Sequence, residues 1–139
     1  SPSIESLRRI SSALGVPLFY FLSETSPRPP VVRRGQRRVL RLPSQEVTYE
    51  LLTPDLSRKM ELFIGELRAG AKNVVYRLSV PTEECIYVLE GRLRVTLVDG
   101  EYILEAGDSI YFDGPALQEL KCVGADKVVF LSAITPPVF

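Results

Sequence analysis

The sequence predicts a mainly β domain, a sandwich or barrel, preceded by a short helical segment. From Glu46 onward, short runs rich in Val, Ile, Leu, Tyr and Phe are separated by turn signals. In the run RLRVTLV (92–98), apolar and polar residues alternate, which is typical of a strand with one buried face. With 139 residues, the chain is long enough for one domain with its own core.

Residues 1–23 predict two short helices. Ser3 can cap the first, apolar residues recur at helical spacing, and Gly15 suits a left-handed helix end. Pro17 can open the second helix, in which LFYFL (18–22) is apolar on nearly all sides. Because two such helices cannot enclose this run, we expect another domain, a second chain or an absent N-terminal portion to cover it.

Residues 24–45 are interpreted as a linker or an extended arm. The segment contains four prolines and six arginines and shows no helical or alternating run of useful length. The arginines suit either phosphate contact beside a DNA-binding unit or a solvated connector, and the connector is the more frequent role of such runs.

Residues 46–139 predict the β domain itself. Turn signals such as Asp99-Gly100 and the AGD at 106–108 separate its strands, and the GDS at 107–109 is read as a turn that enters a strand. The predicted strands lie near 46–52, 60–67, 73–79, 84–90, 92–98, 101–104, 109–112, 117–123 and 127–134.

Composition excludes several functional classes. Lys+Arg and Asp+Glu are equal at 17 each, so no overall field recruits nucleic acid, membrane or an acidic substrate. Two cysteines without zinc-site spacing suit free thiols in a reduced cytoplasmic protein. With no basic-then-apolar leader and no apolar run near membrane length, we expect a cytoplasmic protein without a membrane partner.

Three segments together resemble a known family. GRLRVTLVDGEYILEAGDSIYFD (91–113), preceded by EECIYVLEG (83–91) and closed by ITPPVF (134–139), is similar to the cupin domain of bacterial transcriptional regulators. In that family an N-terminal helix-turn-helix of the Cro/repressor (XRE) type is joined to a C-terminal cupin. Residues 1–22 resemble the last two helices of such a unit, and 31–40 its connection to the barrel. The resemblance implies a double-stranded β-helix, the jelly-roll barrel of cupins.

The first cupin motif lacks its histidines in this chain. Its glutamate and its closing glycine fall on Glu84 and Gly91, which places its two histidine positions on Leu78 and Val80. Neither side chain offers a lone pair to a metal.

The second motif also departs from the family pattern. When its first glycine is placed on Gly107, the proline and glycine positions fall on Asp113 and Pro115, the histidine position on Gln118 and the asparagine position on Cys122. Since a lone carboxylate is a poor site for zinc, iron, manganese or nickel, the chemistry predicts a barrel without metal or other cofactor. With no histidine anywhere, a Ser-His or Cys-His nucleophile is excluded as well, and we expect no catalytic residues.

The barrel is therefore interpreted as a container for a ligand. Glu84 can face either the cavity or the solvent, Gln118 is a candidate hydrogen-bonding residue, and Cys122 suits a small buried hydrophobe better than a sensor thiol. The apolar candidates are either pocket lining or simple core. The candidate pocket comprises Tyr76, Leu78, Val80, Glu84, Ile86, Val88, Gln118 and Cys122.

These observations lead to one hypothesis and two alternatives. The chain is interpreted as the tail of a helix-turn-helix unit (1–23), a linker (24–45) and a cupin sensor (46–139) that forms a homodimer. The sensor would bind a small organic effector and modulate DNA binding by the parent protein, since the recognition helix is absent here. The alternatives are a metal-independent epimerase or isomerase, with Glu84 as base and Tyr76 as acid, and a barrel that serves dimerisation alone.

Overall fold

The structure, a computed structural model, describes residues 6, 9–10, 13–14, 29–42, 47–55, 57–74 and 81–137. In the predicted first helix, the described residues Ser6, Arg9, Ile10, Ala13 and Leu14 are helical. The predicted second helix lies outside the described residues. No helix in the described part of the chain is long and apolar enough to cross a membrane.

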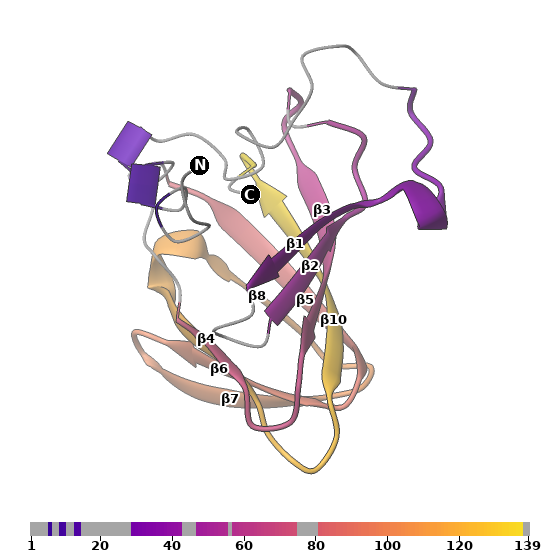
Figure 1. The fold of residues 1–139 in the computed structure, drawn as a ribbon. Helices are drawn as coiled ribbons and strands as arrows, with labels where there is room; N and C mark the ends of the chain where they lie inside the picture. Colours follow the sequence, from indigo (N-terminus) through magenta and orange to yellow (C-terminus); the bar gives the residue numbers. More distant parts are fainter. Residues whose placement is uncertain are drawn as a thin grey trace.

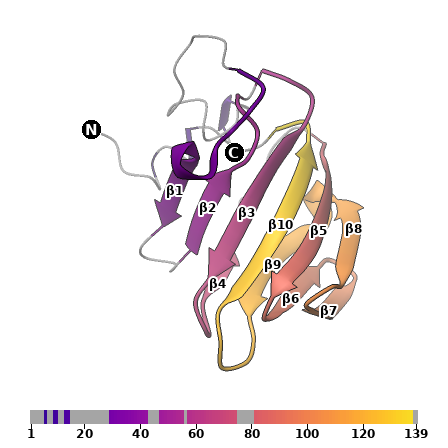
Figure 2. The ribbon, with the colours of Figure 1, turned by 90° about the vertical axis from the view of Figure 1, so that its right-hand side faces the viewer.

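The strands of the described residues form two antiparallel sheets that pack against each other (Figure 1). The larger sheet has six strands in the order β1-β2-β3-β10-β5-β8, and Figure 2 shows it from its outer side. The smaller sheet has four strands in the order β4-β9-β6-β7. The strands are β1 (Arg38–Leu42), β2 (Val47–Leu51), β3 (Glu61–Leu67), β4 (Lys72–Val74), β5 (Glu83–Glu90), β6 (Arg92–Leu97), β7 (Gly100–Glu105), β8 (Ser109–Asp113), β9 (Leu117–Cys122) and β10 (Val128–Thr135).

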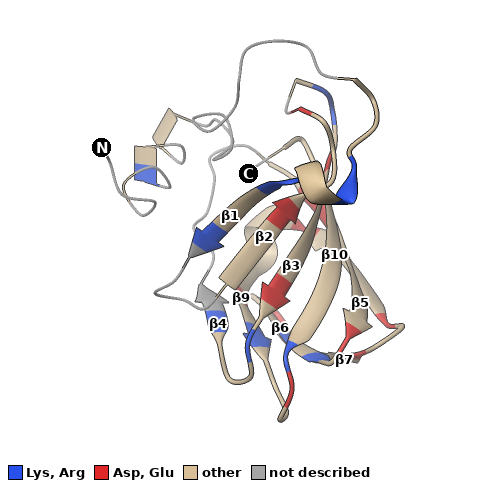
Figure 3. Cartoon of the chain, turned by 45° about the vertical axis from the view of Figure 1, so that its right-hand side comes forward, with Lys and Arg blue, Asp and Glu red and all other residues tan. Residues whose placement is uncertain are grey.

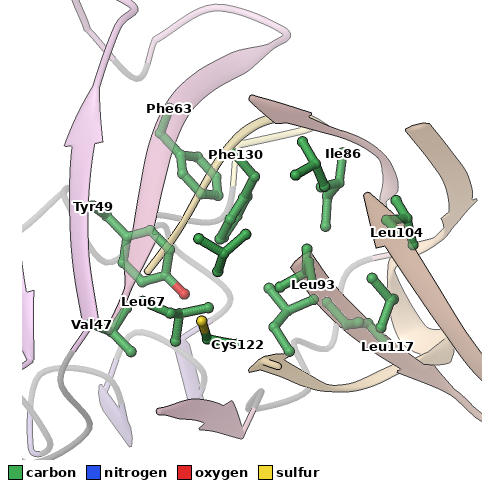
Figure 4. Packing of buried hydrophobic residues seen from close by; sticks show 14 of the residues in the cluster. Val47, Tyr49, Phe63, Leu67, Ile86, Leu93, Leu104, Leu117, Cys122 and Phe130 are labelled. Carbon is green, nitrogen blue, oxygen red and sulfur yellow. The ribbon is translucent and has the colours of Figure 1, made fainter. Parts of the chain in front are cut away.

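The core lies between the two sheets, because every second residue of each central strand points inward. Burial alternates along the whole of β3 and β10, as a pleated strand with one covered face requires. Aromatic and aliphatic side chains of both sheets meet there (Figure 4). Tyr49 and Phe63 pack edge to face with ring centroids 5.1 Å apart. The mainly β prediction is confirmed.

The strands predicted from 46 onward are found close to their predicted positions where they are described, and one further strand precedes them. β4 is described only as far as Val74, so the rest of the predicted strand 73–79 lies outside the described residues. The segment interpreted as a linker ends in a strand, since Arg38–Leu42 pairs with β2 in full register. Leu40 points into the core, with only 2% of its surface exposed. The end of the predicted arm is thus part of the larger sheet.

The turn before β8 confirms the interpretation of the GDS motif. Gly107 has φ of 95°, which a residue with a side chain adopts only at a cost in strain. The Asp108 side chain accepts a hydrogen bond from the backbone N–H of Glu105 at 2.9 Å, and β8 begins at the next residue, Ser109. This turn carries the chain from the smaller sheet back to the larger one.

Candidate functional site

Glu84 has an ionisable side chain that lies inside the barrel. It is the second residue of β5 and is 7% exposed, whereas its neighbour Glu83 is exposed on the outer side. The sequence left both orientations of Glu84 open, and the structure places the side chain inside. The Ser132 hydroxyl on β10 donates a hydrogen bond to Glu84 Oε1 at 2.7 Å. The site therefore begins with a buried carboxyl and a buried hydroxyl.

The strand register explains why these two side chains meet. In β10, Ile134 pairs with Glu84 and Ser132 pairs with Ile86, so Ser132 lies diagonally across from Glu84 on the same face. Burial raises the pKa of Glu84 to about 7, and the hydrogen bond from Ser132 acts in the opposite direction by favouring the carboxylate. Near neutral pH the carboxyl is thus poised between its two protonation states.

A second carboxyl is buried at the same end of the barrel. Glu61, the first residue of β3, is 0% exposed. Ile134 of β10 pairs with Glu61 on one side and with Glu84 on the other, so all three occupy one row across the sheet. Two acids and a serine thus interrupt an otherwise apolar inner face.

Sequence reasoning missed Glu61 and Ser132, although a signal for both was present. In ELFIGEL (61–67), alternation puts Glu61 on the same face of the strand as Phe63 and Leu67, which are buried. In VVFLSAIT (128–135), alternation puts Ser132 on the same inward face as Phe130 and Ile134. A polar residue at a core position of an alternating strand is the observation that would have found them.

Three other predicted pocket residues are buried as expected. Ile86 and Val88 are fully buried on β5 and belong to the hydrophobic core. Cys122 is 1% exposed, and its thiol donates a hydrogen bond to the backbone carbonyl of Asp126 at 3.0 Å. Cys122 is therefore a packed core residue with its thiol already engaged. The remaining apolar candidates, Tyr76, Leu78 and Val80, lie outside the described residues.

Gln118 does not face the interior as predicted. Alternation from Cys122 and Leu120 would place Gln118 inward, but its side chain is exposed. The pairing of β9 with β6 shifts between Thr96 and Leu97, so Leu117 takes the inward position and Gln118 turns outward. The irregularity moves the predicted hydrogen-bonding group out of the barrel.

The residues do not fit the metal that cupin barrels commonly hold. Of the four donor positions implied by the resemblance, Leu78 and Val80 offer no donor atom, Gln118 faces outward, and Glu84 remains. Within the described part of the chain, no group of three or more His, Cys, Asp or Glu could hold a metal ion. Of these four positions, Glu84 alone brings a donor atom into the barrel, and its carboxyl is partly protonated near neutral pH, so the set is a poor metal site.

A small pocket outside the barrel lies where the arm meets the larger sheet. It has a volume of about 100 Å³. The Thr53 hydroxyl oxygen in its wall is buried without a hydrogen-bond partner among the described residues. Sequence reasoning missed this pocket because it assigned the arm to a linker. It is lined by Pro29, Val31, Val32, Gln36, Arg38, Leu51, Thr53 and Pro54.

Comparison with known families agrees with the fold. Residues 69–134 match the family described as the cupin domain. The match covers 66 of the 139 residues of the chain. The match spans the strands that carry Glu84 and Ser132. No curated protein matches the sequence.

Solved structures extend this likeness. An HTH_3 family transcriptional regulator from Vibrio cholerae is 22% identical, with a TM-score of 0.75 over 99% of this chain and 74% of that chain. The cupin domain of an XRE family transcriptional regulator from Enterobacter cloacae is 22% identical, with a TM-score of 0.60 over 65% of this chain and 96% of that chain. KdgF from Halomonas sp. is 11% identical, with a TM-score of 0.61 over 78% of this chain and 94% of that chain. The predicted jelly-roll cupin fold is confirmed.

Proposed function

We propose that this chain is the effector-sensing and dimerisation portion of a bacterial transcriptional regulator. The observation that carries the proposal is the extent of the likeness to the Vibrio cholerae regulator, which reaches 99% of the chain and so includes residues before the cupin match at 69–134. DNA binding is assigned to the parent protein and its helix-turn-helix. A protein of this kind would act in the cytoplasm, where the DNA is.

The effector is proposed to be a small organic molecule that carries an amine or a hydroxyl. The apolar inner face recognises its shape, and Glu84 with Ser132 supplies directional hydrogen bonds. A buried carboxyl favours a cation or a hydrogen-bond donor and disfavours an acid. Occupancy would bias DNA binding if the effector had unequal affinity for two arrangements of the dimer.

A thermal-shift screen of amines, alcohols and acids tests this proposal. A ligand at a hundredfold excess over its Kd stabilises the fold by about 2.7 kcal/mol, which such a screen detects. Glu84→Gln should weaken an amine hit, whereas Glu83→Gln, the neighbouring substitution on the outer side, should not. Leu78→Trp should weaken a hit by filling the proposed cavity. A hit that survives both Glu84→Gln and Leu78→Trp unchanged would place the effector site outside the barrel.

One observation favours a second candidate, a metal-independent enzyme. Burial raises the pKa of Glu84 to about 7, which is suitable for a group that exchanges protons near neutral pH. Ectoine synthase from P. lautus is similar in fold, with 17% identity and a TM-score of 0.57 over 70% of this chain and 69% of that chain. An epimerase or isomerase would exchange a substrate C–H with deuterated solvent, and the exchange would be lost in Glu84→Gln. An enzyme of this kind would need Tyr76 as the acid that partners Glu84, and that role has no support beyond the sequence. We therefore propose the sensor, without enzymatic activity.

A further inference from the structure

The outer face of the six-stranded sheet is apolar where a solvent-exposed face would be polar. In an antiparallel sheet with one solvent-exposed face, residues along each strand normally alternate between apolar side chains that point inward and polar side chains that point outward. Here Leu131 at the centre of β10 points outward and pairs with Ile64 of β3 and Tyr87 of β5, which makes an apolar row across three strands. Tyr111, on the edge strand β8, is 64% exposed on the same face.

The outer face of the smaller sheet shows the contrast. Its outward residues on β6 and β9 are largely charged, and Arg94 and Glu119 form an ion pair at 3.0 Å. Arg92 of β6 and Glu105 of β7 form another at 3.5 Å. Charges that are paired within one sheet suit permanent contact with water. The outer face of the larger sheet also carries ion pairs, Arg37 with Glu50 at 3.1 Å and Lys127 with Glu66 at 2.9 Å, and Glu50 ends the apolar row beside Ile64. The two outer faces therefore differ at their centres, where the larger sheet is apolar.

The apolar face is flanked by opposite charges. On the β1 side lie the exposed Arg41 and, beside the 3-10 turn η2 (Arg34–Gln36), the exposed Arg33 and Arg34. On the β5 and β8 side lie three exposed acids, Glu83, Glu90 and Asp113. Figure 3 shows basic residues on β1 and η2, acidic residues on β5 and an uncharged β10 between them, together with acidic residues on β2 and β3. The face thus has an apolar centre, a basic side and an acidic side.

We infer that this face is the interface between two copies of the chain. In a two-fold dimer the same patch meets itself, so it must be self-complementary. Consider a two-fold axis that runs parallel to the strands and lies above the outer face, over the boundary between β3 and β10. It places the basic side of one copy over the acidic side of the other and brings the two apolar centres into contact. Two sheets packed face to face with nearly aligned strands are a common arrangement. This inference rests on the dimer in the proposed function and specifies the surface that forms it.

Sedimentation equilibrium of the unaltered chain and of two variants tests the interface. Leu131→Glu places a charge at the apolar centre and should weaken self-association by at least about 30-fold, as loss of a central contact does. Ile103→Glu is the matched control, because Ile103 is 49% exposed on the outer face of the smaller sheet. Circular dichroism checks that both variants fold. A dimer that tolerates Leu131→Glu while Ile103→Glu breaks it would overturn the assignment.

A mixing experiment tests the charge arrangement independently of that variant. One triple variant changes Arg33, Arg34 and Arg41 to Glu, and the other changes Glu83, Glu90 and Asp113 to Lys. Each alone should self-associate poorly because like charges then face each other, whereas an equimolar mixture should form a 1:1 heterodimer at low salt. A mixture that stays monomeric would refute the arrangement. A monomeric unaltered chain would refute the dimer itself, and neither result bears on effector binding.

Discussion

Glu84 is one of two carboxyl residues at which the barrel interior departs from an apolar core. A carboxylate taken out of water must be paired or neutralised, and one hydroxyl is a small compensation for an ion. Ser132 satisfies one oxygen at 2.7 Å, while burial still raises the pKa of the group to about 7. A site of this kind is costly to maintain for packing alone, which is why it suits a ligand contact.

The protonation of Glu84 should make stability depend on pH. Below pH 4.5, the ordinary value for the group, the carboxyl is protonated in both the folded and the unfolded chain. Between 4.5 and about 7 the unfolded chain loses the proton while the folded chain keeps it, so the free energy of unfolding falls as pH rises. The loss attributable to Glu84 should reach about 3 kcal/mol and level off above pH 7.

Urea unfolding of the unaltered chain and of Glu84→Gln at pH 5 and pH 8 measures this dependence. The variant keeps the shape of the side chain and cannot titrate, so its stability should change less between the two pH values. Comparing the two proteins separates the contribution of Glu84 from that of the other titratable groups. Equal pH dependence in both would show that Glu84 does not hold its proton in the folded state.

Gly65 is a second residue at which one side chain decides the packing. It lies on β3 opposite Phe130 of β10, and a Cβ at this position would overlap the Phe130 ring. Because the ring is fully buried and can shift only by displacing other core residues, Gly65→Ala should destabilise the fold by roughly 1–3 kcal/mol. Gly35→Ala is the control, since nothing lies within 4 Å of its would-be Cβ. Thermal unfolding that ranks the two variants equally would contradict this packing.

At the scale of elements, β1 joins the predicted arm to the barrel. Leu40 is 2% exposed while the adjacent Val39 is 39% exposed, although both lie on the same edge strand. Leu40→Ala should therefore cost about 2–4 kcal/mol through the lost burial and the cavity left behind, whereas Val39→Ala should be nearly neutral. Equilibrium unfolding in urea measures both. If Leu40→Ala were as mild as Val39→Ala, β1 would be an appendage and the arm would end at the barrel surface.

The difference between predicted and observed elements has a physical cause. Strands such as β3 and β10 are predictable because their alternation and flanking turns are local properties. β1 was missed because its arginines interrupt the pattern, and Leu40 becomes an interior residue only through distant pairing with β2. Gln118 was misplaced for a similar reason, since a shift in pairing is invisible in one strand's sequence.

The candidate site shows the same division. Its family resemblance identified Glu84, but the inward direction of the side chain required the register of β5 with β10. Ser132 comes from a strand far along the chain, and the hydrogen bond to Glu84 spans 48 residues. In the sequence, such residues stand out as polar side chains at core positions of an alternating strand. Only the fold shows that the two side chains meet.

At the scale of the whole molecule, the barrel is expected to be stable without metal. Its core is continuous across both sheets, and three of the family's four donor positions hold apolar or outward-facing residues. A ligand that binds only the folded state stabilises it by about 2.7 kcal/mol at a hundredfold excess over its Kd, which raises Tm by roughly 10 °C in a domain of this size. A metal held by the barrel would therefore be conspicuous in a melting curve.

Melting curves with EDTA and with added zinc, manganese, nickel or ferrous iron should coincide within about 1 °C, because no group of three or more His, Cys, Asp or Glu in the described part of the chain can hold such an ion. Elemental analysis of protein purified without chelator should find less than stoichiometric metal. Glu84→Gln is the control, since any residual binding at the barrel must depend on that carboxylate. A stabilisation that EDTA reverses and Glu84→Gln abolishes would overturn the prediction of a barrel without metal.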